Sequence, residues 1–500
     1  MHRHSPKLAR TFSLTLLVAA LQLSHSAYAL GPAETEAATL KIYVTGGGAA
    51  DANLEATVRG LLNNPSTYTY GGNRRAFWAV SGTLRNPSPI PGIAAGTTVA
   101  FYKRTLGAAF TSTTVASAEA IEHLRTTLAT GTAPNFNVPA GTVAGGQLAL
   151  VRSDAGYSDT PLNLFTAEVN VPDGVSVPSA AALGTLVVKP INVALHGVIV
   201  TLGLRNALQQ QQGLVVGSET EANIPNLSKA AVASLYQGRI ADWTQIVHNG
   251  VPLQVAPGFS SEVYLVPRNP GAAIQASINA RILNVPSNPR APGPKRQDFN
   301  LPPYVYEPAL PGDTDLIFHN FDRGTAFNWV SGDGNTYSEA AGLRRYAIGS
   351  QPADRNTGVA PPAASTTRGA LNYRHIKIDG AAPTLRNAHN GTYPLTVEAV
   401  IVYRSASTPG GALVGTKRLF VDELARRIGS PAVLAANNNN FWHDWGQTGF
   451  LALSVNGHTP DATFSPANPV TGWTFGPGEP DIGRPAVVDD GVANPLLITQ

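Results

Sequence analysis

The stretch from Thr39 to Leu62 constrains the fold of this chain more than any other part of the sequence. It begins with a short apolar run at residues 40–44, continues through the three glycines 46–48, and ends in a helical pattern. The run predicts a buried strand, and the glycines allow the backbone to turn sharply. Because the first N–H groups of a helix are free, a strand, glycine loop and helix start can form an anion site. A plain turn without a ligand is the alternative that this stretch leaves open.

The same order of elements recurs along the chain. An apolar strand at 97–102 leads into the small residues Gly107–Ala109, and a strand at 263–266 leads into a loop with Arg268 and then a helix. Another strand, at 147–152, precedes a turn that is dense in Ser, Asp, Gly and Pro. Strands that alternate with helices predict an α/β protein with mixed, mostly parallel sheets, in which ligands bind at the carboxyl ends of strands.

The other expected elements follow from apolar periodicity and from helix and turn signals. Further strands are predicted at 77–80, 184–201, 346–349, 376–378 and 392–403, helices at 116–128, 204–212, 228–236 and 420–428, and irregular segments at 284–315, 437–440 and 457–500. Ser228 is the predicted N-cap of its helix, because a Ser hydroxyl can accept from a free N–H group of the first turn.

The first 29 residues have the pattern of a secretory signal peptide. Basic residues precede an apolar stretch at 11–23, and Ala27-Tyr28-Ala29 is a typical cleavage site. The apolar stretch is too short to span a bilayer. We therefore expect an exported protein, periplasmic or secreted. The chain contains no Cys, which excludes a lipid-modified cysteine, disulfides and Cys-ligated metals.

Charge and motifs argue against several function classes. Without its leader, which holds three of the 35 basic residues, the chain has balanced charge against 32 acidic residues, so we expect no nucleic-acid partner. It has neither a Gly-x-Ser-x-Gly elbow nor an HExxH motif. His443-Asp444, between Trp442 and Trp445, is the one suggestive cluster, and we interpret it as a packed aromatic loop. We expect a monomer that is not an enzyme and that needs neither a cofactor nor a metal.

Six segments, in this order, resemble motifs of the phosphate-binding proteins of ABC transporters, which are type 2 periplasmic binding proteins. They are residues 42–49 (IYVTGGGA), 156–162 (GYSDTPL), 227–243 (LSK to GRIADW), 268–276 (RNPGAAIQA), 346–349 (YAIG) and 376–395 (IKIDGAAP to GTYPL). The resemblance covers residues 40–404, except for the inserts at 63–95 and 284–340.

The resemblance implies two lobes that close over an oxyanion. Residues 30–190 would form the first part of lobe 1, 191–380 lobe 2, 381–455 the return to lobe 1, and 456–500 an irregular tail. The implied ligand is phosphate or a related oxyanion, and an ABC transporter membrane subunit would be the partner.

The resemblance also implies a set of ligand-binding residues. Thr45, Gly46 and Ser158 would donate hydrogen bonds, Asp159 would accept the proton of phosphate and reject sulfate, and Arg268 would make a forked contact. The full expected set is Thr45, Gly46, Gly47, Gly107, Ser158, Asp159, Arg268 and Gly271.

The chain departs from the family pattern at two of these loops. Ala272, Ala273 and Ile274 stand where the family has Ser, Gly and Thr, and alanine follows Gly107 where the family usually has serine. Each lost hydrogen bond to a charged ligand costs roughly 1.5–3 kcal/mol. The alternative is therefore a secreted protein of the same fold that has lost phosphate binding and acts as an interaction or surface protein.

Overall fold

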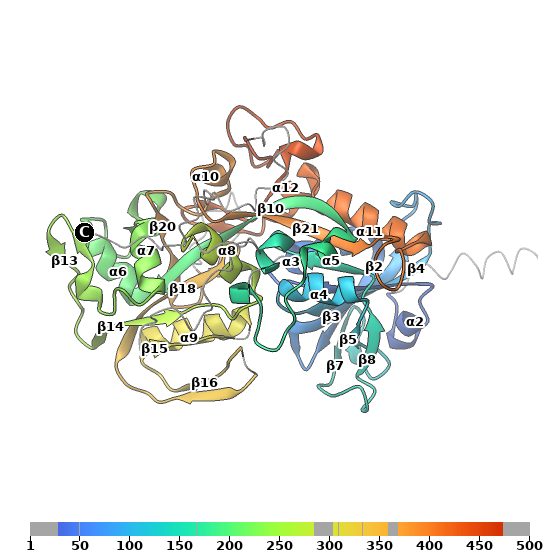
Figure 1. Ribbon diagram of the computed structural model, residues 1–500, viewed down its shortest axis with the longest axis horizontal. Helices are drawn as coiled ribbons and strands as arrows, with labels where there is room; N and C mark the ends of the chain where they lie inside the picture. The colour runs from blue at the N-terminus through green and yellow to red at the C-terminus, as the bar shows by residue number, and fades with distance from the viewer. Residues whose placement is uncertain are drawn as a thin grey trace, which may run out of the picture.

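The computed structural model describes residues 29–49, 51–166, 168–284, 304–308, 310–332, 334–358 and 369–473. The predicted signal peptide up to residue 28, most of the predicted loop at 284–315 and the chain beyond 473 lie outside the described residues. The described chain is an α/β protein in which one large sheet extends through the molecule (Figure 1). None of its described helices is long and apolar enough to cross a membrane.

Fourteen strands form the large sheet, in the order β15-β14-β18-β10-β21-β9-β1-β4-β3-β2-β7-β6, with β19 and β24 also paired to β10. The bounds are β1 (Leu40–Gly46), β2 (Leu62–Tyr70), β3 (Asn73–Leu84), β4 (Thr98–Thr105), β6 (Thr130–Thr132), β7 (Asn135–Val138), β9 (Ala155–Ser158), β10 (Leu186–Thr201), β14 (Phe259–Val266), β15 (Tyr304–Val305), β18 (Arg344–Pro352), β19 (Tyr373–His375), β21 (Thr396–Arg404) and β24 (Phe450–Ala452).

Parallel pairs in this sheet form two main groups, β9-β1-β4 and β15-β14-β18. The long strands β10 and β21 join these groups through antiparallel pairs. The α/β class and the mixed sheet are confirmed. Antiparallel pairing is more extensive than we expected, because β10 crosses between the groups and because the insert at 63–95 forms the β2–β3 hairpin.

Five short pairs lie outside the large sheet: β5 (Ala120–Leu124) with β8 (Leu148–Arg152), β11 (Asn226–Leu227) with β20 (Lys377–Ile378), β12 (Val247–His248) with β13 (Val251–Pro252), β16 (Phe327–Val330) with β17 (Thr336–Glu339), and β22 (Trp442–His443) with β23 (Gly446–Gln447). The described helices are α2 (Pro32–Glu36), α3 (Asp51–Leu61), α4 (Ala109–Ser117), α5 (Ala180–Gly184), α6 (Leu202–Gln211), α7 (Lys229–Tyr236), α8 (Ala273–Arg281), α9 (Pro311–Arg323), α10 (Leu385–His389), α11 (Gly415–Ile428) and α12 (Pro431–Asn438).

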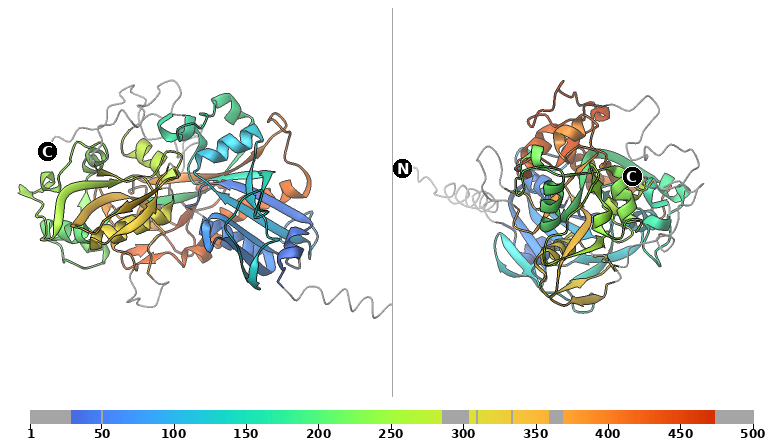
Figure 2. Two further views of the ribbon diagram at one scale, coloured as in Figure 1. Left: turned by 90° about the horizontal axis from the view of Figure 1, so that it is seen from below. Right: turned by 90° about the vertical axis from the view of Figure 1, so that its left-hand side faces the viewer.

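Two separate hydrophobic cores flank the crossing strands. In one, alternate residues of β1, Leu40, Ile42 and Val44, pack with α3, α11 and α12. In the other, α6, α7 and α8 pack on β14 and β18. Because successive residues of a strand face opposite sides, β21 contributes to the core under α11 on one face and contacts α4 on the other. Figure 2 shows α4 and α11 on opposite sides of the sheet.

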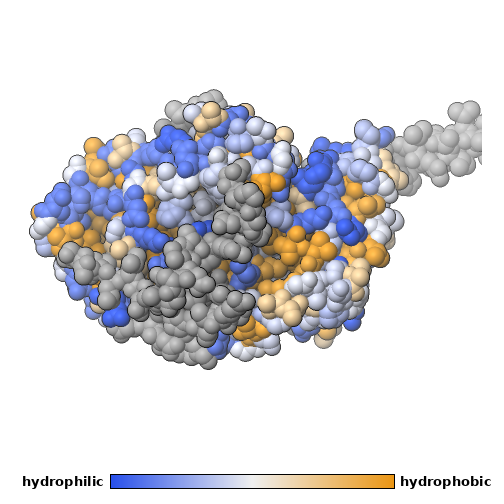
Figure 3. All heavy atoms as spheres, turned by 45° about the horizontal axis from the view of Figure 1, so that its top comes forward, coloured by the Kyte–Doolittle hydropathy of each residue, from blue (hydrophilic) through white to orange (hydrophobic). Residues whose placement is uncertain are grey.

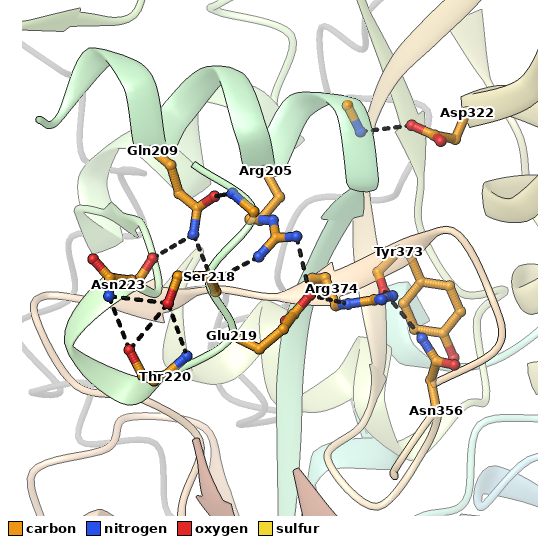
Figure 4. A network of polar contacts seen from close by, with 12 residues as sticks. Arg205, Gln209, Ser218, Glu219, Thr220, Asn223, Asp322, Asn356, Tyr373 and Arg374 are labelled. Carbon is orange, nitrogen blue, oxygen red and sulfur yellow. Dashed lines mark hydrogen bonds and ion pairs between the residues drawn. The ribbon is translucent and has the colours of Figure 1, made fainter. Parts of the chain in front are cut away.

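On the face drawn in Figure 3, the half of the molecule at the right, which contains β1, exposes more hydrophobic residues than the other half. A polar network around Glu219 lies inside the half that contains α6. Glu219 Oε1 accepts from Arg205 at 3.0 Å and from Arg374 at 2.9 Å (Figure 4). Gln209 adds hydrogen bonds to the carbonyls of Ser218 and Asn223, so the segment after α6 is tied back to that helix.

Most predicted elements are present, including the N-cap of α7, where Ala231 N–H donates to the Ser228 hydroxyl at 3.0 Å. The helix predicted at 116–128 is wrong. Helix α4 ends at Ser117, because Ala118 takes a left-handed conformation with φ +55°, and the chain then forms β5 against β8. The apolar spacing there reflects a strand pairing that local periodicity does not reveal.

Two predicted loops also begin or end differently. The segment at 284–315 was expected to be irregular, but helix α9 starts at Pro311, whose ring suits the first helical position. The loop expected at 437–440 is wrong in part, since α12 continues to Asn438. The Asn438 amide bonds both the N–H and the carbonyl of Phe450, which anchors the end of that helix.

Candidate functional site

The glycine loop after β1 is built by close backbone contacts. Gly46 has φ +123°, and a Cβ there would collide with the carbonyl of Tyr157. Gly47 N–H donates to that same carbonyl at 2.9 Å, and Leu106 N–H donates to the Gly46 carbonyl at 2.9 Å. The carboxyl ends of β1, β4 and β9 therefore meet at one place, as expected for adjacent parallel strands.

Lys103 supports this loop from inside the protein. Its side chain is fully buried, and Nζ donates to the carbonyls of Gly46 and Gly47 at 3.0 Å each. Nζ also lies 3.4 Å from Asp51 Oδ1, and Thr105 donates to the other oxygen of Asp51 at 2.6 Å. Burial lowers the pKa of Lys103, while the Asp51 carboxylate opposes that shift. Sequence reasoning missed Lys103, although a lysine inside an apolar strand is itself an unusual signal.

Asp159 is a buried carboxylate next to the glycine loop. Any Cβ on Gly47 would collide with its Oδ1, so the loop sequence and this side chain are matched. Burial raises the pKa of Asp159 to about 6, while Lys103 and a backbone hydrogen bond from Ala49 act in the opposite direction. Its Oδ1 accepts no hydrogen bond from any residue that the structure describes.

Arg268 and Thr45 lie buried at the carboxyl ends of β14 and β1. Burial lowers the pKa of Arg268 to about 10, so its guanidinium stays charged at neutral pH. The charges of Arg268 and Asp159 interact. Thr45 Oγ1 is buried without a hydrogen-bond partner among the described residues. Ser158 differs, because its hydroxyl donates to the Thr160 carbonyl at 2.5 Å within its own turn.

Gly107 and Gly271, the other two expected ligand residues, lie against each other. A Cβ on Gly107 would approach the Gly271 carbonyl oxygen to 2.6 Å. The same carbonyl accepts from Ala109 N–H, the first residue of α4, at 3.1 Å. An apolar cluster surrounds this contact, and it consists of Ala108, Ala109, Leu164, Phe165, Val171, Ala273, Ala276 and Ala280. A protein carbonyl thus occupies the Ala109 N–H group, and the two expected ligand residues Gly107 and Gly271 contact each other.

The structure also brings in polar groups that sequence reasoning missed. The hydroxyl of Tyr157, which precedes Ser158 on β9, is buried and has no partner among the described residues. Asp354, just beyond β18, also has a buried Oδ1 that lacks a hydrogen-bond partner among the described residues. Burial raises the pKa of Asp354 to about 6, the Arg355 guanidinium lowers it, and the charge of Asp159 raises it further. An acidic residue soon after a buried strand was a signal that we did not use.

His443, the histidine singled out in the sequence, lies in an aromatic cluster. The His443 ring stacks on Trp445 at 4.2 Å, and its Nε2 lies 2.9 Å from the Ala353 carbonyl. Burial lowers the pKa of His443 to about 4. This geometry agrees with a packed aromatic loop. Among the described residues, no group of three or more His, Asp or Glu side chains is arranged to hold a metal ion.

No protein-family model matches this chain, and no match was found among curated proteins. Solved structures similar to this chain include substrate-binding proteins of phosphate ABC transporters. One is a putative phosphate ABC transporter substrate-binding protein with bound phosphate from Clostridium perfringens, at 11% identity and a TM-score of 0.38, covering 79% of this chain and 97% of the other. Another is PstS from Borrelia burgdorferi, at 10% identity and a TM-score of 0.32, covering 83% and 98%. An ABC-type phosphate transport receptor from Vibrio cholerae has 12% identity and a TM-score of 0.28, covering 58% and 82%. At these values the ligand has to be argued from this chain's own residues.

Proposed function

We propose that this chain is an exported solute-binding protein that captures phosphate or a related small oxyanion, and that it is not an enzyme. One observation carries the proposal: Thr45 Oγ1 and Asp159 Oδ1 are buried and lack partners among the described residues, and the charge of Arg268 interacts with that of Asp159. Buried polar groups are nearly always hydrogen-bonded, and an unsatisfied one costs about 1–3 kcal/mol. A protonated oxyanion satisfies both kinds of group, since it accepts from Thr45 and Arg268 and donates to Asp159.

Asp159 supplies the selectivity in this proposal. An ionised carboxylate accepts a hydrogen bond from a protonated oxyanion, whereas sulfate has no proton to donate and is repelled. Asp159 accepts a backbone hydrogen bond from Ala49, its charge interacts with that of Lys103, and its Oδ1 lies where a Cβ on Gly47 would be. Phosphate is accordingly the proposed ligand.

The two hydrophobic cores support a two-lobed binder. In our proposal the lobes have the boundaries expected from sequence, 30–190 with 381–455 and 191–380, and they close over the ligand. The leader directs the protein to the periplasm or the medium, where it acts as a monomer and delivers its ligand to an ABC transporter membrane subunit.

A second candidate function rests on the contact between Gly107 and Gly271. The Ala109 N–H group donates to a protein carbonyl, and alanines surround it. These groups are not available to an anion in this arrangement. This observation favours a protein of the same fold that has lost phosphate binding and acts as an interaction or surface protein.

Calorimetric titration of the purified exported protein with phosphate and sulfate distinguishes the two candidates. We expect the native protein to bind phosphate and reject sulfate, and Asp159→Asn to lose that discrimination while Arg268→Lys binds phosphate about 10–100-fold more weakly. The surface variant Lys41→Met serves as the control and should behave as native. Absence of heat and of thermal stabilisation with either anion would favour the second candidate.

A further inference from the structure

A second buried carboxylate, that of Asp354, points to a more specific ligand. Asp159 directly follows the last residue of β9, and Asp354 comes two residues after the end of β18. Each has an Oδ1 atom that is buried and that receives no hydrogen bond within the described part of the chain. Since β9 and β18 belong to one sheet, Asp159 and Asp354 both follow the carboxyl ends of its strands, where ligands bind in α/β proteins.

The strand register brings these two ends toward the same stretch of β10. Ser158 pairs with Val400 of β21, and Val400 pairs with Pro190 of β10, so the chain beyond β9 continues along β10 toward its middle. Strand β18 runs in the opposite direction, and Ala353 N–H donates to the Leu195 carbonyl at 2.9 Å. The two chain segments thus approach the middle of β10 from opposite directions.

The charges around the two carboxylates agree with this placement. The charges of Asp159 and Asp354 interact with each other, and both interact with the buried Tyr157 hydroxyl. Arg355, the neighbour of Asp354, is held by Asp315 at 2.8 Å. Two carboxylates therefore share a region in which the neighbouring Arg355 guanidinium is engaged by a third carboxylate.

A complementary ligand must match this set of donors and acceptors. The buried atoms without partners among the described residues include two carboxylate oxygens, which only accept, and the hydroxyls of Thr45 and Tyr157, which can donate. We propose that Asp354 is a second specificity-determining carboxylate, and that the site takes a small oxyanion in a form that carries two O–H groups. Dihydrogen phosphate is the simplest such ligand. This inference rests on the proposed oxyanion-binding function.

Calorimetric titration with three inorganic anions at about pH 6.5 tests the proposal, because this pH lies above the pKa of about 6 that burial gives Asp159 and Asp354, so both carboxylates are mainly ionised. There, phosphate is mainly the dihydrogen anion with two O–H groups, phosphite is smaller and has one, and sulfate has none. We expect the native protein to bind phosphate about 10–100-fold more tightly than phosphite. Asp354→Asn should weaken phosphate binding by a similar factor and phosphite binding much less, so that the preference falls to a few-fold.

The outcomes separate this inference from the function on which it rests. If the native protein binds none of the anions, the proposed function fails and the inference fails with it. If phosphate binds but phosphite binds equally well, the inference alone is overturned, and this result needs no variant. An unchanged preference in a folded Asp354→Asn protein also overturns it. The exposed Asp461→Asn is the matched control, and thermal unfolding verifies that each variant is folded.

Discussion

The loops before α3 and α4 have the same local plan, a strand followed by glycine and a helix, yet their surroundings differ. The loop before α3 rests on the buried charge of Lys103 and lies against Asp159. The loop before α4 lies against Gly271 and is enclosed by alanines and other apolar residues. The first arrangement has polar atoms that a ligand can satisfy, whereas the second is already satisfied by the protein. The difference teaches that two strand–glycine–helix units can leave different groups for a ligand. Beside the first loop the side-chain atoms Thr45 Oγ1 and Asp159 Oδ1 lack partners among the described residues, although Gly47 N–H already donates to Tyr157, whereas at the second loop Ala109 N–H donates to the Gly271 carbonyl.

The largest expected effect comes from removing the charge under the first loop. Lys103→Met removes the Nζ donor from the carbonyls of Gly46 and Gly47, of which only Gly46 retains another donor among the described residues, the Leu106 N–H, and leaves Asp51 without its partner cation. Breaking a buried pair on one side costs about 3–5 kcal/mol, so we expect that loss in urea-unfolding free energy. Lys41→Met, on the same sheet half but partly exposed, should cost less than about 1 kcal/mol. Equal losses in the two variants would contradict the structural role of Lys103.

The next effect is the pH dependence that Asp159 contributes. Its pKa is raised from 3.8 to about 6 in the folded protein, so the folded state binds this proton more tightly than the unfolded state. The contribution of Asp159 to the free energy of unfolding is therefore fully present below pH 3.8. It is lost as the pH rises from there through about 6, so the protein is less stable at neutral pH. Since one pKa unit corresponds to about 1.4 kcal/mol, Asp159→Asn should reduce the fall in stability over this range by about 3 kcal/mol.

Unfolding curves of both proteins at several pH values measure this difference. The comparison with native protein is needed because burial lowers the pKa of His196 to about 3, and such groups change stability in the opposite direction. Asp461→Asn should leave the pH dependence unaltered. If the free energy of unfolding changed with pH in the same way in the native protein and in Asp159→Asn, burial of Asp159 would not be energetically important.

The smallest expected effect concerns the apolar contact between α4 and α8. Ala273 is 4% exposed and packs in the cluster with Ala109. Ala273→Leu should destabilise the protein by about 1–3 kcal/mol through overpacking, as measured by thermal unfolding. The same change at Ala180, which is exposed at the start of α5, should have little effect. A neutral Ala273→Leu would mean that the two helices separate readily and that the α4 N–H groups can be released.

The sequence was informative for single elements and less so for their contacts. Strand β1, the glycine turn and helix α3 were predicted from periodicity and glycine alone, because these signals act between neighbouring residues. The register of β1 and β9 places Gly46 opposite Tyr157, two residues before Asp159, while the ligand-binding role of the expected residues stays a prediction. The helix predicted after residue 116 was wrong, because strand β5 depends on pairing with β8, which no local pattern reveals.

By itself, the sequence determined the α/β class, the buried strands and the glycine loops, since backbone freedom and apolar spacing are local properties. The tertiary structure decided how the polar groups are used. It placed Lys103 under the glycine loop, directed the Ser158 hydroxyl to Thr160, and brought Asp354 toward Asp159. These outcomes depend on which distant segments share a buried space, because there each polar group must find a partner or remain for a ligand.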